Sequence, residues 1–123
     1  MLRNDAIRLR HMLDAAQEAI AFARGRTRSD LNDSRMLVLS LVKAIEIIGE
    51  AAFRISPATR AELQDIPWDA IIGMRHRLVH AYFDINLDIL WRTVTDELPD
   101  LIDVLIPHLA EHDNMSDFGQ EQP

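Results

Sequence analysis

Apolar residues recur along the first half of the chain at alternating steps of three and four, the spacing that places them on one face of a helix. In residues 3–24 the series is Ala6, Leu9, Leu13, Ala16, Ile20 and Ala23. In residues 34–55 a more apolar series has the same spacing, with Val38, Leu41, Val42, Ile45, Ile48, Ala52 and Ile55. These patterns predict two long amphipathic helices, the second of them the most buried helix of the chain. Between them, the segment GRTRSDLNDS predicts a polar turn.

Proline and small polar residues mark the start of two more helices. Ser56 precedes Pro57, which is the arrangement of an N-cap residue followed by proline in the first turn. A short helix is therefore expected, ending before Asp65. Pro67 has the same role for a longer helix, which we predict to run from residue 67 to about residue 83.

The last apolar segment begins near Asp84 or Asn86, either of which can cap a helix. Pro99 should kink or split this helix, because proline has no backbone N–H to donate and its ring clashes with the preceding turn. We expect one domain over residues 1–112 and a polar, disordered tail over residues 113–123.

The complete pattern predicts an all-α fold. It contains no alternating strand pattern of convincing length, no repeat and no low-complexity tract. An up-and-down bundle of four main helices plus a short helix accounts for the segments. A chain of 123 residues, 48% of them hydrophobic, suffices for one such domain.

Composition excludes several kinds of site. The sequence has no cysteine, so disulfides, thiolate metal ligands and a cysteine nucleophile are excluded. No uncharged run approaches the ~18 residues of a membrane helix, and we expect a cytosolic protein without a membrane partner. The formal net charge of -7 argues against a broad basic surface for nucleic acid. The arginines at positions 24, 26 and 28 are interpreted as part of a solvated loop.

The segment MRHRLVHAYFD, residues 74–84, concentrates polar side chains in a helix whose pattern is otherwise buried. In a continuous helix, His76 and His80 lie one turn apart, and Arg75 shares a broad side with His80, roughly 140° away. One interpretation is a helix end that carries cations near the negative end of the helix dipole. The other is a catalytic site, because histidine has a near-neutral pKa and arginine binds phosphate. Together they are the minimum needed to cut RNA without a metal.

Glu46 and Glu50 lie one helical turn apart and are candidates for a carboxylate metal site. Helical di-iron sites also need a histidine three residues after a glutamate, and none of the five histidines has an acidic residue at that spacing. We therefore predict a structural ion pair, with Glu50 bound to an arginine of the helix at 67–83. Neither a metal nor another cofactor is expected.

The spacing Arg75-x4-His80-x-Tyr82 resembles the RX4HXY signature of HEPN-domain proteins, and within them the HepT toxins. Three further segments are similar to the same family in the same order: AIEIIGEAAFRIS, IPWDAIIGMRHRLVHAYF and ILWRTVTDELPDLI. The chain departs from the pattern at His76, where the family more usually has asparagine or another small polar residue.

The resemblance implies an all-helical HEPN fold and a homodimer in which the motifs of the two chains face each other across a shared cleft. It implies metal-independent cleavage of RNA, as an endo- or exoribonuclease. Arg75 would bind phosphate and offset charge in the transition state, and His80 would act as acid or base. His76 and Arg77 are candidates to assist.

The resemblance also implies a partner. HepT-like toxins are usually paired with an MNT-type nucleotidyltransferase antitoxin, which transfers AMP from ATP to the motif tyrosine, here Tyr82. The toxin and its antitoxin are expected to form a larger hetero-oligomer. On residue chemistry alone, Tyr82 at a helix end would be a packing aromatic that donates one hydrogen bond. The alternative function is a non-catalytic helical scaffold, or a partner that presents a substrate to the nucleotidyltransferase.

Overall fold

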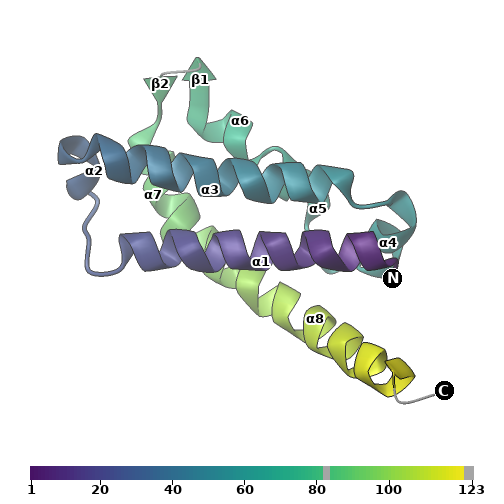
Figure 1. Ribbon diagram of the computed structural model, residues 1–123. Helices are drawn as coiled ribbons and strands as arrows, with labels where there is room; N and C mark the ends of the chain where they lie inside the picture. The colour runs from purple at the N-terminus through teal and green to yellow at the C-terminus, as the bar shows by residue number, and fades with distance from the viewer. Residues whose placement is uncertain (82–83, 121–123) are drawn as a thin grey trace.

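The computed structural model describes residues 1–81 and 84–120, and two long antiparallel helices form its centre (Figure 1). Helix α1 (Arg3–Ala23) and helix α3 (Arg35–Arg54) follow the two predicted apolar series. Gly25 has a φ of 75°, the left-handed conformation that often ends a helix and that glycine adopts without strain. The predicted turn also holds a short helix, α2 (Asp30–Asp33), which the sequence pattern did not reveal.

A third helical rod crosses the pair formed by α1 and α3 (Figure 1). It consists of α7 (Leu87–Arg92), a π-helical turn η1 (Thr93–Glu97) and α8 (Leu98–Gln120). The predicted interruption at Pro99 takes the form of this π turn, because the wider turn just before the proline relieves the contact between its ring and the preceding carbonyl. The domain limit at residue 112 stays a prediction, and the helical backbone continues past it.

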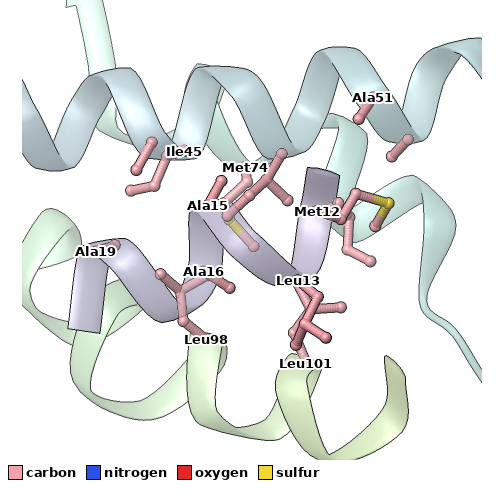
Figure 2. Close-up of a cluster of buried hydrophobic side chains, with 14 of the residues drawn as sticks. Met12, Leu13, Ala15, Ala16, Ala19, Ile45, Ala51, Met74, Leu98 and Leu101 are labelled. Carbon is pink, nitrogen blue, oxygen red and sulfur yellow. The ribbon is translucent and has the colours of Figure 1, made fainter. Parts of the chain in front are cut away.

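The core lies where the three rods meet, and Figure 2 shows Leu13 and Ala16 of α1 directed toward Leu101 and Leu98 of α8. Alanine side chains let the helix backbones approach closely, while leucine fills the space between them. Burying each leucine contributes about 1.5–3 kcal/mol. None of the helices in the described residues combines the length and apolar character that crossing a bilayer requires.

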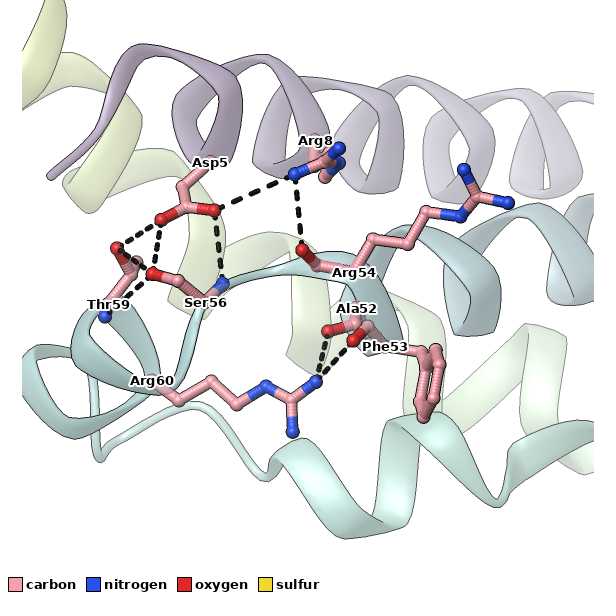
Figure 3. Close-up of polar contacts among 8 residues, drawn as sticks. All are labelled: Asp5, Arg8, Ala52, Phe53, Arg54, Ser56, Thr59 and Arg60. Atoms are coloured by element: carbon pink, nitrogen blue, oxygen red, sulfur yellow. Dashed lines mark hydrogen bonds and ion pairs between the residues drawn. The ribbon is translucent and has the colours of Figure 1, made fainter.

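The predicted short helix is confirmed as α4 (Pro57–Glu62), with Ser56 as its N-cap. The hydroxyl of Ser56 accepts a hydrogen bond from the Thr59 amide at 3.3 Å. Figure 3 shows that Ser56 and Thr59 also contact the carboxylate of Asp5, so the start of α4 is fixed to the start of α1.

The long helix predicted over residues 67–83 is wrong. The structure instead has α5 (Trp68–Ile72), α6 (Met74–Leu78) and two short antiparallel strands, β1 (Val79–Ala81) and β2 (Asp84–Ile85). The strands project beyond the helices at one side of the molecule (Figure 1). The fold is therefore a helical bundle, as predicted, but a broken segment and a hairpin replace one of its four main helices.

Candidate active site

The segment that holds the motif bends at Gly73, between α5 and α6. An added Cβ at this position would lie 3.3 Å from the carbonyl oxygen of Asp69, which is tighter than an ordinary contact. Helix α6 has only five residues, and Met74 and Leu78, which lie one turn apart, are both buried in the core. These two anchors orient the remaining side chains of α6 away from the core.

Arg75 lies at the edge of this anchored face and is half-buried. Its Nε atom is buried and has no hydrogen-bond partner in the described part of the chain. A buried donor without an acceptor costs free energy, and such groups are rare in folded proteins. Arg75 is thus a half-buried cation on α6 whose Nε donor is unused in the described part of the chain.

Arg77 points to a different neighbour and is engaged on two sides. Its Nη1 lies 3.0 Å from Oε1 of Glu97 in η1, and its Nη2 donates to the carbonyl oxygen of Ala70 in α5 at 3.2 Å. Arg77 therefore links α6 to both α5 and the π turn.

His80 lies on β1 and is exposed. Val79 pairs with Ile85 and Ala81 with Asp84, so the register shifts between Val79 and Ala81 and His80 has no residue directly opposite. This is the arrangement of a β-bulge, a feature that re-aims side chains and occurs often beside active sites. The imidazole is consequently accessible to a substrate from solvent.

The base of the hairpin is fixed to the helices on both sides. The amide of Asn86 donates to the carbonyl oxygen of Leu78 at 2.7 Å. The side chain of Asn86 accepts from the Ile89 amide at 3.0 Å and so caps α7, which makes Asn86 the cap of the two candidates, Asp84 and Asn86, that the sequence offered. The strand pair that carries His80 is thus attached to α6 through β1 and to α7 through β2.

Two other predictions about the motif are affected. His76 is exposed on α6, and the predicted stacking of His76 and His80 on one helix face is wrong, because the helix ends at Leu78 and His80 is in a strand. Tyr82 lies outside the described residues.

Among the described residues, the ion pairs found for the α3 glutamates do not involve the motif segment. Glu46 lies 3.8 Å from Lys43 on the same helix, whereas Glu50 is exposed and forms no ion pair with the described arginines of α6. The predicted pairing of Glu50 with such an arginine is therefore wrong. Within the described residues, no group of three or more potential ligands is placed to hold a metal ion.

Sequence reasoning missed one polar residue of this region, Glu97. It lies 20 positions after Arg77, beyond any helical or strand spacing, so no local pattern could connect them. The bulged strand did have a signal. The sequence VHAYFDI alternates apolar and polar residues over positions 79–85, which is the period of a β-strand.

Comparison with known proteins identifies the family to which the chain belongs. The model of a family described as ribonuclease HepT-like matches residues 12–107, which include the second half of α1, all of α3, the strand pair and most of the crossing rod. The chain belongs to the HepT-like ribonuclease family.

Curated relatives agree with this HepT-like assignment. A protein of Caldanaerobacter subterraneus subsp. tengcongensis named "Putative RNase TTE0752" is 34% identical over 93 residues, which cover 76% of this chain and 83% of the relative. A protein of Thermococcus cleftensis named "Probable ribonuclease HepT" is 31% identical over 101 residues, which cover 82% of this chain and 92% of the relative. No solved structure matches the chain.

Proposed function

We propose that this HepT-like chain is a ribonuclease, endo- or exonucleolytic, and that Arg75 and His80 carry its reaction. The observation that supports this most directly is the placement of His80, exposed on a bulged strand immediately after the short helix that holds Arg75. Family membership and the names of the relatives support RNA as the substrate.

The proposed chemistry needs no metal. An imidazole takes the proton of a ribose 2′-hydroxyl, whose oxygen attacks the adjacent phosphorus. The bond from phosphorus to the 5′-oxygen then breaks, and a protonated imidazole returns a proton to that oxygen. The products are a 2′,3′-cyclic phosphate and a 5′-hydroxyl. The guanidinium of Arg75 binds the phosphate and offsets the charge that develops on it.

A homodimer with the two motifs across a shared cleft fits this chemistry, because two copies of His80 can provide the base and the acid. The exposed position of His80 supports such an arrangement, since the imidazole is open to a second chain as well as to substrate. Static light scattering should therefore give a mass near twice the 14.1 kDa of the chain. A monomer that still cleaves RNA would exclude the shared cleft.

The first test is RNA cleavage by the purified chain in EDTA, beside Arg75→Ala and His80→Ala. We expect cleavage by the parent, losses of at least about a hundredfold in both variants, and 2′,3′-cyclic phosphate ends on the products. Cleavage that requires added metal, or that survives in His80→Ala, would contradict the proposal.

We further propose that the chain is the toxin of a HEPN/MNT toxin–antitoxin pair and that a nucleotidyltransferase neutralises it by transferring AMP to Tyr82. Tyr82 follows His80 by two residues, so a bulky anionic nucleotide attached there would compete with RNA for the same cationic side chains. This part rests on the family resemblance and on the proximity of the two residues in the sequence.

The tyrosine proposal is tested by co-expressing the chain with an MNT-type nucleotidyltransferase and measuring intact mass. We expect one or more AMP additions, absent in Tyr82→Phe, together with loss of ribonuclease activity. Modification at a different residue would contradict the assignment. A parent chain that is folded, accepts AMP and never cleaves RNA would instead support the scaffold function.

A further inference from the structure

Arg77 has the contacts of a residue that holds other elements in place. Its two terminal nitrogens are bound to the carbonyl of α5 and to the carboxylate of η1, at 3.2 Å and 3.0 Å. Two of the five N–H donors of its guanidinium are thus directed at protein acceptors from two different elements. Helix α6 has only five residues and could not keep its orientation through its own hydrogen bonds alone.

Glu97 is the second half of this arrangement. It closes the π turn, and its side chain is 39% exposed, yet its Oε2 atom is buried and has no hydrogen-bond partner in the described part of the chain. Burial of an unpaired carboxylate oxygen is costly, so the Glu97 side chain is held at an energetic disadvantage. π turns inside helices are frequent at functional sites.

We propose that Glu97 is a positioning residue, which acts through Arg77 to fix α6 and hence the location of Arg75 relative to His80. The inference rests on the proposed ribonuclease function. In this arrangement the Glu97 carboxylate of η1 binds Nη1 of Arg77, and the Ala70 carbonyl of α5 binds Nη2. These two contacts oppose rotation of α6 and its movement along the helix axis. Displacement of a catalytic group by about 1 Å is enough to lower a rate about a hundredfold.

The competing explanation is that Arg77 contacts RNA and that Glu97 only neutralises it. The two explanations predict opposite results for Glu97→Ala. If Arg77 binds RNA, removing its counter-charge frees a cation, so KM should fall and kcat should hold. If Arg77 positions α6, Glu97→Ala should lower kcat about tenfold to a hundredfold with little change in KM.

The test measures kcat and KM for RNA cleavage in Glu97→Ala, Arg77→Ala and the double variant. We expect kcat of the double variant to be no lower than kcat of the more impaired single variant, because both substitutions remove the same contact. Glu97→Gln keeps an acceptor for Nη1 and should retain more of kcat than Glu97→Ala. A fall in KM with unchanged kcat, or full additivity in the double variant, would overturn the proposal.

A matched control comes from the ion pair between Arg10 and Asp113. In both pairs the arginine side chain is 45% exposed, and the Arg10 pair is the shorter, at 2.7 Å, but it joins α1 to α8 away from the motif. Asp113→Ala should leave kcat unchanged within twofold. An equal loss of kcat in Asp113→Ala would show that removing any such ion pair impairs the protein, and would overturn the specific role of Glu97.

Amide hydrogen exchange separates this inference from the proposed function. Exchange at residues 74–78 should be faster in Glu97→Ala and Arg77→Ala than in the parent and in Asp113→Ala. Hydrogen exchange can be measured even if the parent does not cleave RNA. In that case the proposed ribonuclease function is rejected, and the exchange rates still show whether Glu97 and Arg77 hold α6 in place. If His80→Ala is inactive while Glu97→Ala matches the parent in both exchange and kcat, the positioning role fails and the function stands.

Discussion

Asp5 is a charged side chain buried in the described part of the chain, and its neighbours explain why it is tolerated there. The hydroxyls of Ser56 and Thr59 each donate to its Oδ2 at 2.6 Å, and the Ser56 amide donates to its Oδ1 at 3.1 Å. Burial alone would raise the pKa of Asp5, but these hydrogen bonds and nearby Arg8 outweigh it and hold the pKa below its usual range. The ionised carboxylate therefore stabilises the junction of α1 and α4.

The sign of the pH dependence follows from that shift. A carboxyl whose pKa is lowered by folding contributes stability that is present above its unfolded pKa, about 3.9, and is lost as pH falls through the folded pKa. Asp5→Asn should lower the free energy of unfolding by about 1–3 kcal/mol at pH 7, because the amide leaves hydrogen-bond donors unpaired. The difference between parent and variant should shrink below about pH 4.

Denaturant unfolding at pH 7, 5 and 3 measures this difference. Asp14→Asn is the control, because Asp14 is an exposed carboxylate on the same helix and should change stability by less than about 0.5 kcal/mol. An Asp5→Asn penalty as large at pH 3 as at pH 7 would mean that the charge of Asp5 contributes nothing.

At the residue scale, the sequence could name the chemistry of the site but not its connections. Arg75 and His80 are recognisable from their spacing, since a motif is a local property of the chain. Glu97 and Asp5 acquire their partners only when distant elements pack, over separations of 20 and 51 residues or more. Such pairs leave no periodic signal.

At the element scale, predictions succeeded where one period continued over many residues. Helices α1 and α3 each complete several turns with an apolar face, so the pattern determined them almost to the residue. The segment at 67–83 failed because helical and strand periods follow each other within a few residues. Gly73 and the alternation after Leu78 were both visible in the sequence, but each signal is short.

The cap of α7 provides a test at this scale. Asn86→Ala removes the side-chain acceptor for the Ile89 amide and should lower the free energy of unfolding by about 0.5–2 kcal/mol. It should also reduce ribonuclease activity, since α7 anchors the strand pair that carries His80. Thermal unfolding followed by circular dichroism, with parallel RNA cleavage, measures both effects.

Asn86→Ser is the matched control variant. Serine keeps an oxygen that can cap the helix, so this variant should retain most of the stability. If Asn86→Ser is as unstable as Asn86→Ala, the contribution of Asn86 does not come from the cap.

At the scale of the whole molecule, the protein has a negative net charge, whereas typical RNA-binding domains are basic. The net charge is -7, and Arg28 is already paired with Asp88 at 2.7 Å, so part of the arginine content is neutralised internally. The prediction of a solvated loop at Arg24–Arg28 is therefore incomplete, because Arg28 attaches this loop to α7. Long-range attraction of RNA should be weak, and binding should depend on a few contacts.

This view predicts a shallow salt dependence. RNA binding by His80→Ala should show a slope of log K against log salt of about -1.4. This value assumes the proposed homodimer, with one phosphate contact by Arg75 of each chain at about 0.7 per contact. Fluorescence anisotropy with a labelled single strand measures this slope between about 50 and 300 mM salt. Adding Arg75→Ala should bring the slope near zero, and a slope steeper than about -4 would indicate a broad basic surface instead.

The π turn at η1 has a consequence for how the length of this chain can vary among related sequences. Each residue of an α-helix advances the helix by about 100°. A π turn holds one residue more than an α turn in nearly the same rotation, so deleting one residue within 93–97 would restore a regular turn and leave Leu101, Leu105 and Leu109 facing the core. The same deletion in the regular helix α8 would instead rotate the residues after it by about 100°. Alignments of relatives should therefore show gaps in the surface loops or a single-residue gap within 93–97, and none in the regular part of the crossing rod. A single-residue gap within 93–97 would mark a relative whose crossing rod is regular and packs in the same phase.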